Sequence, residues 1–128
     1  MSDSAPPPPL GTIVWHDLTV PHATEVRDFY RDVIGWTTGT ESMGDYEDYY
    51  VLSPESGQVV GGVCHARGSN ANLPPAWLMY VAVDDVEAAC EKAIAKGGEV
   101  VDGPRAMGPG KFAVIRDPAG AFIGIITR

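Results

Sequence analysis

The chain has 128 residues, of which 45% are hydrophobic and 20% are charged, and its formal net charge at pH 7 is −8. A chain of this length buries enough apolar surface to fold as one domain without disulfides or a metal. The acidic charge argues against nucleic acid and membranes as partners, because both are bound through a basic surface. The N-terminus also lacks the basic and apolar regions of a signal peptide, so we expect a cytoplasmic protein.

Residues 1–10 predict a disordered tail. The four prolines Pro6–Pro9 favour an extended polyproline II conformation and exclude a helix. A tail of this kind could alternatively serve as a docking segment for a proline-binding partner. The two cysteines, Cys64 and Cys90, form no metal or redox motif, and Cys90 is expected in the core.

The first half of the chain predicts a strand, a helix and three further strands. Residues 12–20 predict a strand, since the alternation over Trp15–Val20 is typical of a strand with two different faces. Residues 23–34 form a helix with one apolar side, and Gly35 stands where its left-handed C-cap is needed. The apolar side consists of Val26, Phe29, Tyr30 and Val33. The next strands are expected from Trp36, over 46–52 and over 58–66, with a bend or loop at Gly39, Met43 and Gly44 and a turn at 53–57.

The second half repeats this order after a polar linker at 67–75. Residues 77–83 predict a strand, and Asp84 or Asp85 caps the helix that follows. The buried face of this helix is expected to be Val86, Ala89, Cys90, Ala93 and Ile94, and Gly97 and Gly98 end it. The remaining elements are a short strand at 99–101, a loop at 102–110, and strands at 112–116 and 121–127 around a hairpin turn.

Matched spacings indicate that the two halves are copies of one unit. Val20 and Gly35 are 15 residues apart, as are Val83 and Gly98. Gly61 and Gly124 differ by the same offset of 63 residues as these pairs. We therefore predict an α+β fold with two βαβββ modules, 11–66 and 76–128, in a single domain over 11–128. Two such half-sheets can curl into an incomplete barrel with the helices outside and a cavity inside.

Several segments resemble the vicinal oxygen chelate (VOC) superfamily, which holds glyoxalase I, bleomycin-resistance proteins and extradiol dioxygenases. They are Phe29–Tyr30 nine residues after Val20, then Val33–Trp36, Val83–Asp85, Gly97–Gly98 and Asp117–Gly120. The resemblance covers residues 11–128 and implies the two-module barrel. It does not fix an activity, because the superfamily performs many unrelated reactions. The strand patterns also resemble a metal-poor, glyoxalase-like subgroup.

The same resemblance indicates where a metal would bind. In metal-using members, each half supplies one ligand from its first strand and one from its last. Carried over to this chain, the four positions are Trp15, Gly61, Leu78 and Gly124. None of these side chains binds a metal, and His16 is one residue out of phase on its strand. We therefore expect no metal and no cofactor, with a divalent ion held by other residues as the alternative.

The cavity is then expected to bind a small molecule. Its predicted ligand-binding residues are Trp15, Asp17, Thr19, Tyr50, Leu78, Tyr80, Phe122 and Gly124. An aromatic cavity with one carboxylate suits a small, partly aromatic or apolar ligand. Asp17 is the best candidate for a catalytic acid or base. As a partner of Tyr80 or of a backbone amide it would be structural instead, and the cavity side chains could also pack together and close the space.

Three functions are consistent with these features. The first is a metal-independent small-molecule-binding protein, for which antibiotic sequestration by bleomycin-resistance proteins is the precedent. The second is a lyase, isomerase or dioxygenase of the superfamily, with or without a metal. The third is a protein-interaction module that presents the proline-rich tail. A homodimer is expected because exposed edges of a half-barrel favour pairing, either around complete cavities or with halves exchanged between two chains.

Overall fold

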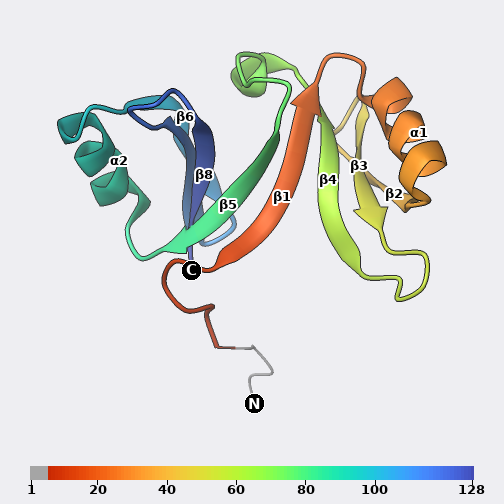
Figure 1. Cartoon of the computed structure of the whole chain (residues 1–128), viewed down its shortest axis with the longest axis horizontal. Helices are drawn as coiled ribbons and strands as arrows, with labels where there is room; N and C mark the ends of the chain where they lie inside the picture. Colours follow the sequence, from red (N-terminus) through yellow and green to blue (C-terminus); the bar gives the residue numbers. More distant parts are fainter. Residues whose placement is uncertain (1–5) are drawn as a thin grey trace. The chain divides into compact units, whose positions relative to one another are not determined.

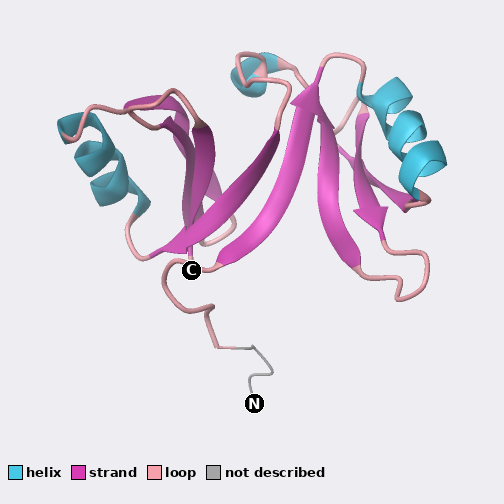
Figure 2. Cartoon of the chain, viewed as in Figure 1, coloured by secondary structure: helices cyan, strands magenta, loops and turns pink. Residues whose placement is uncertain are grey.

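The computed structural model describes residues 6–128, which fold into two compact units (Figure 1). The first unit consists of residues 15–78. The second consists of residues 79–128 together with residues 6–14. Each unit contains one α-helix and four of the eight β-strands (Figure 2).

The first unit follows the predicted strand–helix–three-strand order. Its elements are β1 (Ile13–Val20), α1 (Ala23–Ile34), β2 (Thr37–Ser42), β3 (Glu47–Leu52) and β4 (Val59–His65), followed by the 3-10 turn η1 (Gly68–Asn70). The strands lie in the order β2-β3-β4-β1, and β1 runs parallel to β4 whereas the other neighbours are antiparallel. Helix α1 packs on β2, β3 and β4.

The second unit has the same topology. Its elements are β5 (Trp77–Val83), α2 (Val86–Ala95), β6 (Glu99–Met107), β7 (Gly110–Arg116) and β8 (Phe122–Thr127). Their order is β5-β8-β7-β6, with β5 parallel to β8 and with α2 packed on β6, β7 and β8. The prediction of an α+β fold built from two βαβββ modules is therefore confirmed.

Each unit has its own hydrophobic core between helix and sheet. In the first unit the buried members are Leu18, Val20, Ala23, Tyr49, Val51 and Val63, and the partly buried side chains around them include Tyr30, Trp36 and Trp77. In the second unit they are Val86, Cys90, Ala113 and Ile125. Cys90 is thus a core residue, as predicted.

The helix ends also agree with the sequence. Gly35 has a φ of 92°, a left-handed conformation that glycine adopts without a steric penalty, and its N–H donates to Arg31 O. Asp85 caps α2, since its Oδ1 accepts a hydrogen bond of 3.0 Å from the N–H of Ala88.

Two loop predictions were correct only in part. Residues 37–42 form β2 although they include Gly39, whereas Met43 and Gly44 lie in the loop that follows. Residues 102–107 belong to β6, and only residues 108–109 of the predicted loop connect it to β7. In both cases the hydrogen bonds to a neighbouring strand, β3 for β2 and β7 for β6, outweigh the local preference of glycine and proline for a loop. Two register shifts near Asp102 and Arg105 accommodate Gly103 and Pro104, so β6 continues along β7 as far as Met107.

The predicted apolar faces of the helices were only partly correct. On α1, Val26 and Tyr30 pack against the core, but Phe29 and Val33 are 57% and 65% exposed. On α2, Ile94 is 61% exposed. The sheet covers a narrower stripe of each helix than hydrophobic periodicity alone suggests, and in α1 the fully buried Ala23 occupies part of that stripe.

The predicted tail is described only in part, since residues 1–5 lie outside the described residues. Beyond them, Pro8 O accepts a hydrogen bond from Arg128, and Gly11 N donates to Ala82 O at 2.8 Å. Residues 8–12 therefore run along the second unit. Over residues 6–128, neither helix has the length and apolar character needed to cross a bilayer.

Candidate functional site

The face of the first sheet that points away from α1 gathers half of the predicted ligand-binding residues. Asp17 stands opposite Gly62, Thr19 opposite Cys64, and Tyr50 opposite Gly62. Because alternate residues of a strand share a face, Trp15, Asp17, Thr19 and Tyr50 lie on one side. The same face receives Glu41, Asp48 and Cys64, which the sequence analysis did not select. We call these seven residues with Gly62 the carboxylate face.

The polar groups of this face bind one another. Trp15 Nε1–H donates to Asp17 Oδ2 at 3.2 Å. The Tyr50 hydroxyl donates to Glu41, and this hydrogen bond is the main reason why the pKa of Tyr50 is raised. Burial, followed by the charges of Asp17, Asp48 and Glu41, raises the pKa of the Cys64 thiol far above its ordinary value. The thiol therefore stays protonated at neutral pH and is a poor nucleophile.

Asp48 connects the two sides of this sheet. It is only 7% exposed, and its Oδ1 accepts hydrogen bonds from the backbone N–H of His65 at 2.9 Å and from the ring Nδ1 at 3.2 Å. Its carboxylate also accepts from the Cys64 thiol. The sequence analysis missed Asp48, because only the pairing of β3 with β4 brings it next to Cys64 and His65.

The corresponding face of the second unit is more apolar. Tyr80 is 5% exposed and its ring covers Gly124, where an added Cβ would lie 2.2 Å from the ring. The Phe112 ring packs at 6.4 Å from that of Tyr80. Phe122 is partly buried under the guanidinium of Arg116. Leu78, the remaining member of the predicted set, is 2% exposed and belongs to the first unit.

An ion pair between a buried carboxylate and a partly exposed guanidinium borders this second face. Arg105 donates to Asp102 at 2.7 Å, and its guanidinium lies 4.7 Å from the centre of the Phe112 ring. Only 6% of the Asp102 side chain is exposed, so its carboxylate is shielded from solvent and depends on Arg105 for a compensating charge. The two modules thus share a topology but differ in the chemistry of their open faces.

The carried-over metal positions need one correction. Gly62, not Gly61, shares a face with Trp15 and Asp17, whereas a Cβ at Gly61 would meet His16 O at 2.8 Å. The reason is a register shift between β3 and β4 that places one extra residue, Val60, in β4. Gly62 pairs with Asp17, and Gly124 pairs with Tyr80 at the same place in the second unit. Because of the extra residue, these two glycines are 62 residues apart, whereas Asp17 and Tyr80 are 63 residues apart.

The corrected positions do not fit a metal ion. Trp15, Gly62, Leu78 and Gly124 offer no side-chain ligand, and His16 is exposed with the opposite phase on β1. Within residues 6–128, no three or more His, Cys, Asp or Glu side chains converge closely enough to hold an ion. The divalent metal of the metal-using relatives therefore has no matching ligand set at these positions.

A model of a known protein family matches nearly the whole chain, including both repeated modules. Residues 12–125 match the family model for the Glyoxalase/Bleomycin resistance protein/Dioxygenase superfamily. The chain belongs to this superfamily. Both the two-module fold and the family predicted from sequence are thus confirmed.

Two curated proteins are similar to this chain in sequence. The chain is 32% identical over 117 residues to a Mycobacterium tuberculosis protein named as a glyoxylase, CFP32, with 91% of this chain and 44% of that protein covered. It is 30% identical over 128 residues to the anthracycline biosynthesis protein DnrV of Streptomyces peucetius, with 90% and 46% covered. The chain spans less than half the length of these relatives.

Solved structures show the same fold at low sequence identity. A variant of Streptomyces coelicolor methylmalonyl-CoA epimerase in complex with 2-nitronate-propionyl-CoA aligns with a TM-score of 0.53 and 17% identity, covering 92% of this chain and 97% of the epimerase. A hypothetical protein from Bacillus halodurans aligns with a TM-score of 0.56 and 12% identity, covering 92% and 94%.

Proposed function

We propose that this superfamily member binds a small, partly aromatic or apolar molecule in a metal-free cavity to which the carboxylate face contributes Trp15, Asp17, Thr19 and Tyr50. The observation that carries the proposal is the lack of side-chain ligands at Trp15, Gly62, Leu78 and Gly124. A site without the metal must hold its ligand through packing and hydrogen bonds. The indole of Trp15 and the ring of Tyr50 supply the apolar surface.

The comparisons support a small molecule rather than a macromolecule as the ligand. One relative is named as a glyoxylase, another for anthracycline biosynthesis, and a structural neighbour was solved with a coenzyme A derivative. The net charge of −8 disfavours nucleic acid for the same reason as above. That Tyr80, Phe122 and Gly124 of the second unit, and Leu78, also bind a ligand stays a prediction from the sequence.

Asp17 is the group on this face to which we assign a chemical role. The Trp15 indole N–H holds its carboxylate in place at 3.2 Å. An oriented carboxylate beside a bound ligand can bind a hydrogen-bond donor or accept a proton, so an enzyme of the lyase or isomerase type is the alternative function. The predicted homodimer and cytoplasmic location likewise remain predictions.

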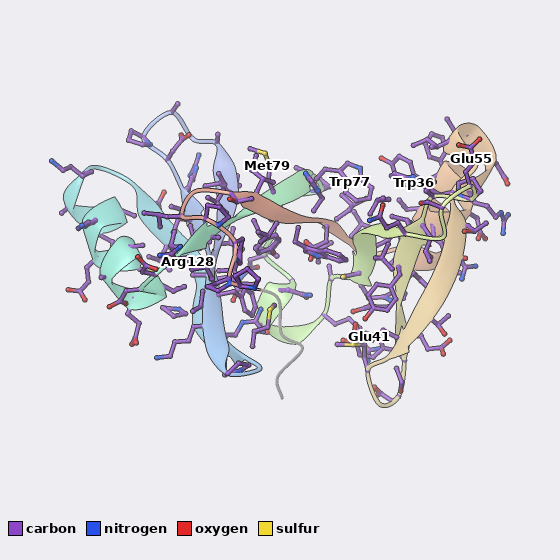
Figure 3. The ribbon with its side chains drawn as sticks, turned by 90° about the horizontal axis from the view of Figure 1, so that it is seen from below. Trp36, Glu41, Glu55, Trp77, Met79 and Arg128 are labelled. Atoms are coloured by element: carbon purple, nitrogen blue, oxygen red, sulfur yellow. The ribbon has the colours of Figure 1, made fainter. Side chains whose placement is uncertain are left out.

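A ligand screen with matched variants tests the proposal. The chain, purified without chelator, is analysed for bound metal and screened by ligand-observed NMR against small aromatic molecules. We expect no stoichiometric metal, and hits whose affinity falls at least fivefold in Trp15→Ala or Asp17→Asn. Glu55→Gln is the control variant. Glu55 lies in an exposed turn, far from Glu41 in Figure 3, so this variant should bind like the wild type. The proposal would be refuted by one tightly bound metal ion per chain, or by hits whose affinity is the same in both variants as in the wild type.

A further inference from the structure

A pocket lies in the first unit, on the other side of the sheet from the carboxylate face. It has a volume of about 470 Å³ and is lined by residues that include Thr24, Asp45, Tyr46, Glu47, Tyr49 and His65. Tyr49 and His65 alternate with Tyr50 and Cys64 along their strands and therefore point away from the carboxylate face. The volume falls within the range of small-molecule sites. We call it the His65 pocket.

The imidazole of His65 is held in one orientation. Nδ1 lies 3.2 Å from Oδ1 of the buried Asp48. The rings of Tyr46 and Tyr49 pack against the imidazole, with centroids at 5.6 Å and 5.8 Å. A carboxylate oxygen beside Nδ1 favours the tautomer that carries its proton on Nδ1, and in the neutral imidazole of this tautomer Nε2 is a hydrogen-bond acceptor. About 20% of the side chain remains exposed, which leaves the ring open to a ligand.

The other polar groups of the pocket also favour a ligand that donates hydrogen bonds. Asp45 and Glu47 are exposed carboxylates on its rim, and Glu47 makes no ion pair with any residue of the described chain. The hydroxyls of Thr24 and Tyr49, which also line the pocket, are 2.6 Å apart and bind each other. Acceptors therefore dominate the groups that a ligand would meet.

One side chain of the protein already shows how a cation fits at this rim. The guanidinium of Arg67 lies 3.9 Å from the centre of the Tyr46 ring and 3.7 Å from the carboxylate of Asp45. An aromatic face next to a carboxylate is the arrangement that attracts ammonium and guanidinium groups. Glu47 adds a second carboxylate to the pocket lining, and His65 adds a ring nitrogen beside the rings of Tyr46 and Tyr49.

We propose that the His65 pocket binds a small protonated amine with an aromatic or apolar body. The ammonium donates hydrogen bonds to Nε2 of His65 and to the carboxylate of Glu47, and the body packs on Tyr46. This site is independent of the proposed function, because its residues face the other side of the sheet and no step of that function uses them.

NMR titration with two matched probes tests the site. Benzylamine is charged at neutral pH and benzyl alcohol is its neutral analogue of nearly the same shape. We expect benzylamine to shift the His65 ring signals of ¹⁵N-histidine-labelled protein in a saturable manner, and benzyl alcohol to bind at least fivefold more weakly. His22 and His16, both exposed and outside the pocket, are the internal controls and should not shift in a saturable manner.

Two variants complete the test. His65→Phe keeps a ring between Tyr46 and Tyr49 but lacks the acceptor, and it should abolish saturable binding, followed on the Tyr46 signals. Glu47→Gln removes one exposed charge and should weaken binding about threefold, the size of a single solvent-exposed charge pair. Glu47 is at the surface, so this variant decides the question even if His65→Phe does not fold. Equal binding of both probes, or wild-type affinity in Glu47→Gln, would overturn the proposal.

Discussion

Adding a methyl group at Gly124 should destabilise the protein, whereas adding one at Gly62 should not. The two glycines are structural counterparts, since Gly124 pairs with Tyr80 and Gly62 with Asp17. A Cβ at position 124 would lie 2.2 Å, 2.4 Å and 2.7 Å from Cδ2, Cε2 and Cγ of Tyr80. At position 62 the nearest atoms, in Trp15 and Asp17, would be 3.4 Å and 3.5 Å away, which is ordinary van der Waals contact.

The size of the effect follows from these distances. Tyr80 is 5% exposed, so its ring has to turn within a packed face to admit the methyl group of Gly124→Ala. Overpacking of this kind costs about 1–3 kcal/mol. For a chain of this length that lowers the melting temperature by roughly 3–12 °C. Gly62→Ala meets no such obstacle and reduces the conformational freedom of the unfolded chain, so its free energy of unfolding should stay equal or rise by about 0.5 kcal/mol.

Urea denaturation of both variants, with a double-mutant cycle at Tyr80, measures the effect. Tyr80→Ala removes the ring, so Gly124→Ala should cost almost nothing in that background, and the coupling between the two positions should equal most of the single-variant loss. Equal changes in unfolding free energy for the two glycine variants would contradict the close approach of Tyr80 to β8. So would a cycle that is additive within about 0.3 kcal/mol.

Three further predictions concern the core, a helix cap and the buried thiol. Val63→Ala, at a fully buried site, should lower the unfolding free energy by about 1–3 kcal/mol, whereas Val59→Ala, 43% exposed on the same strand, should change it by less than about 0.5 kcal/mol in urea titrations. Asp85→Ala should cost about 1 kcal/mol by the same assay, because the Ala88 N–H loses its acceptor. The pKa of Cys64 is raised in the folded state, so the unfolded chain loses this proton first. Stability should therefore fall as the pH rises above the ordinary thiol value of 9.0, and Cys64→Ala should flatten this dependence between pH 8.5 and 10; an unchanged slope would contradict it.

The carboxylate face shows how far the sequence leads toward a site. Strand alternation placed Trp15, Asp17 and Thr19 on one side, and the structure brings Tyr50 to the same side. Glu41 and Asp48 were missed because they carry no local signal of function. They reach this face only through the register of β2 with β3 and of β3 with β4.

Local chemistry determined much of the fold from sequence alone. Gly35 ends α1 because its backbone is left-handed, Asp85 begins α2 because its carboxylate caps a free N–H, and the repeat spacing revealed two modules. The two helix signals depend on residues close together in the chain, and the repeat depends on a fixed spacing along it, so none of them requires knowledge of three-dimensional contacts.

Only the tertiary structure decided the features that depend on strand pairing. The extra residue in β4 moves the metal-equivalent position from Gly61 to Gly62, and the ladder to β7 extends β6 through Gly103 and Pro104. The same pairing places Asp48 beside His65 and creates a pocket on the far side of the sheet. A shift of one residue turns a side chain to the opposite face, and hydrogen bonds between segments far apart in sequence set that shift.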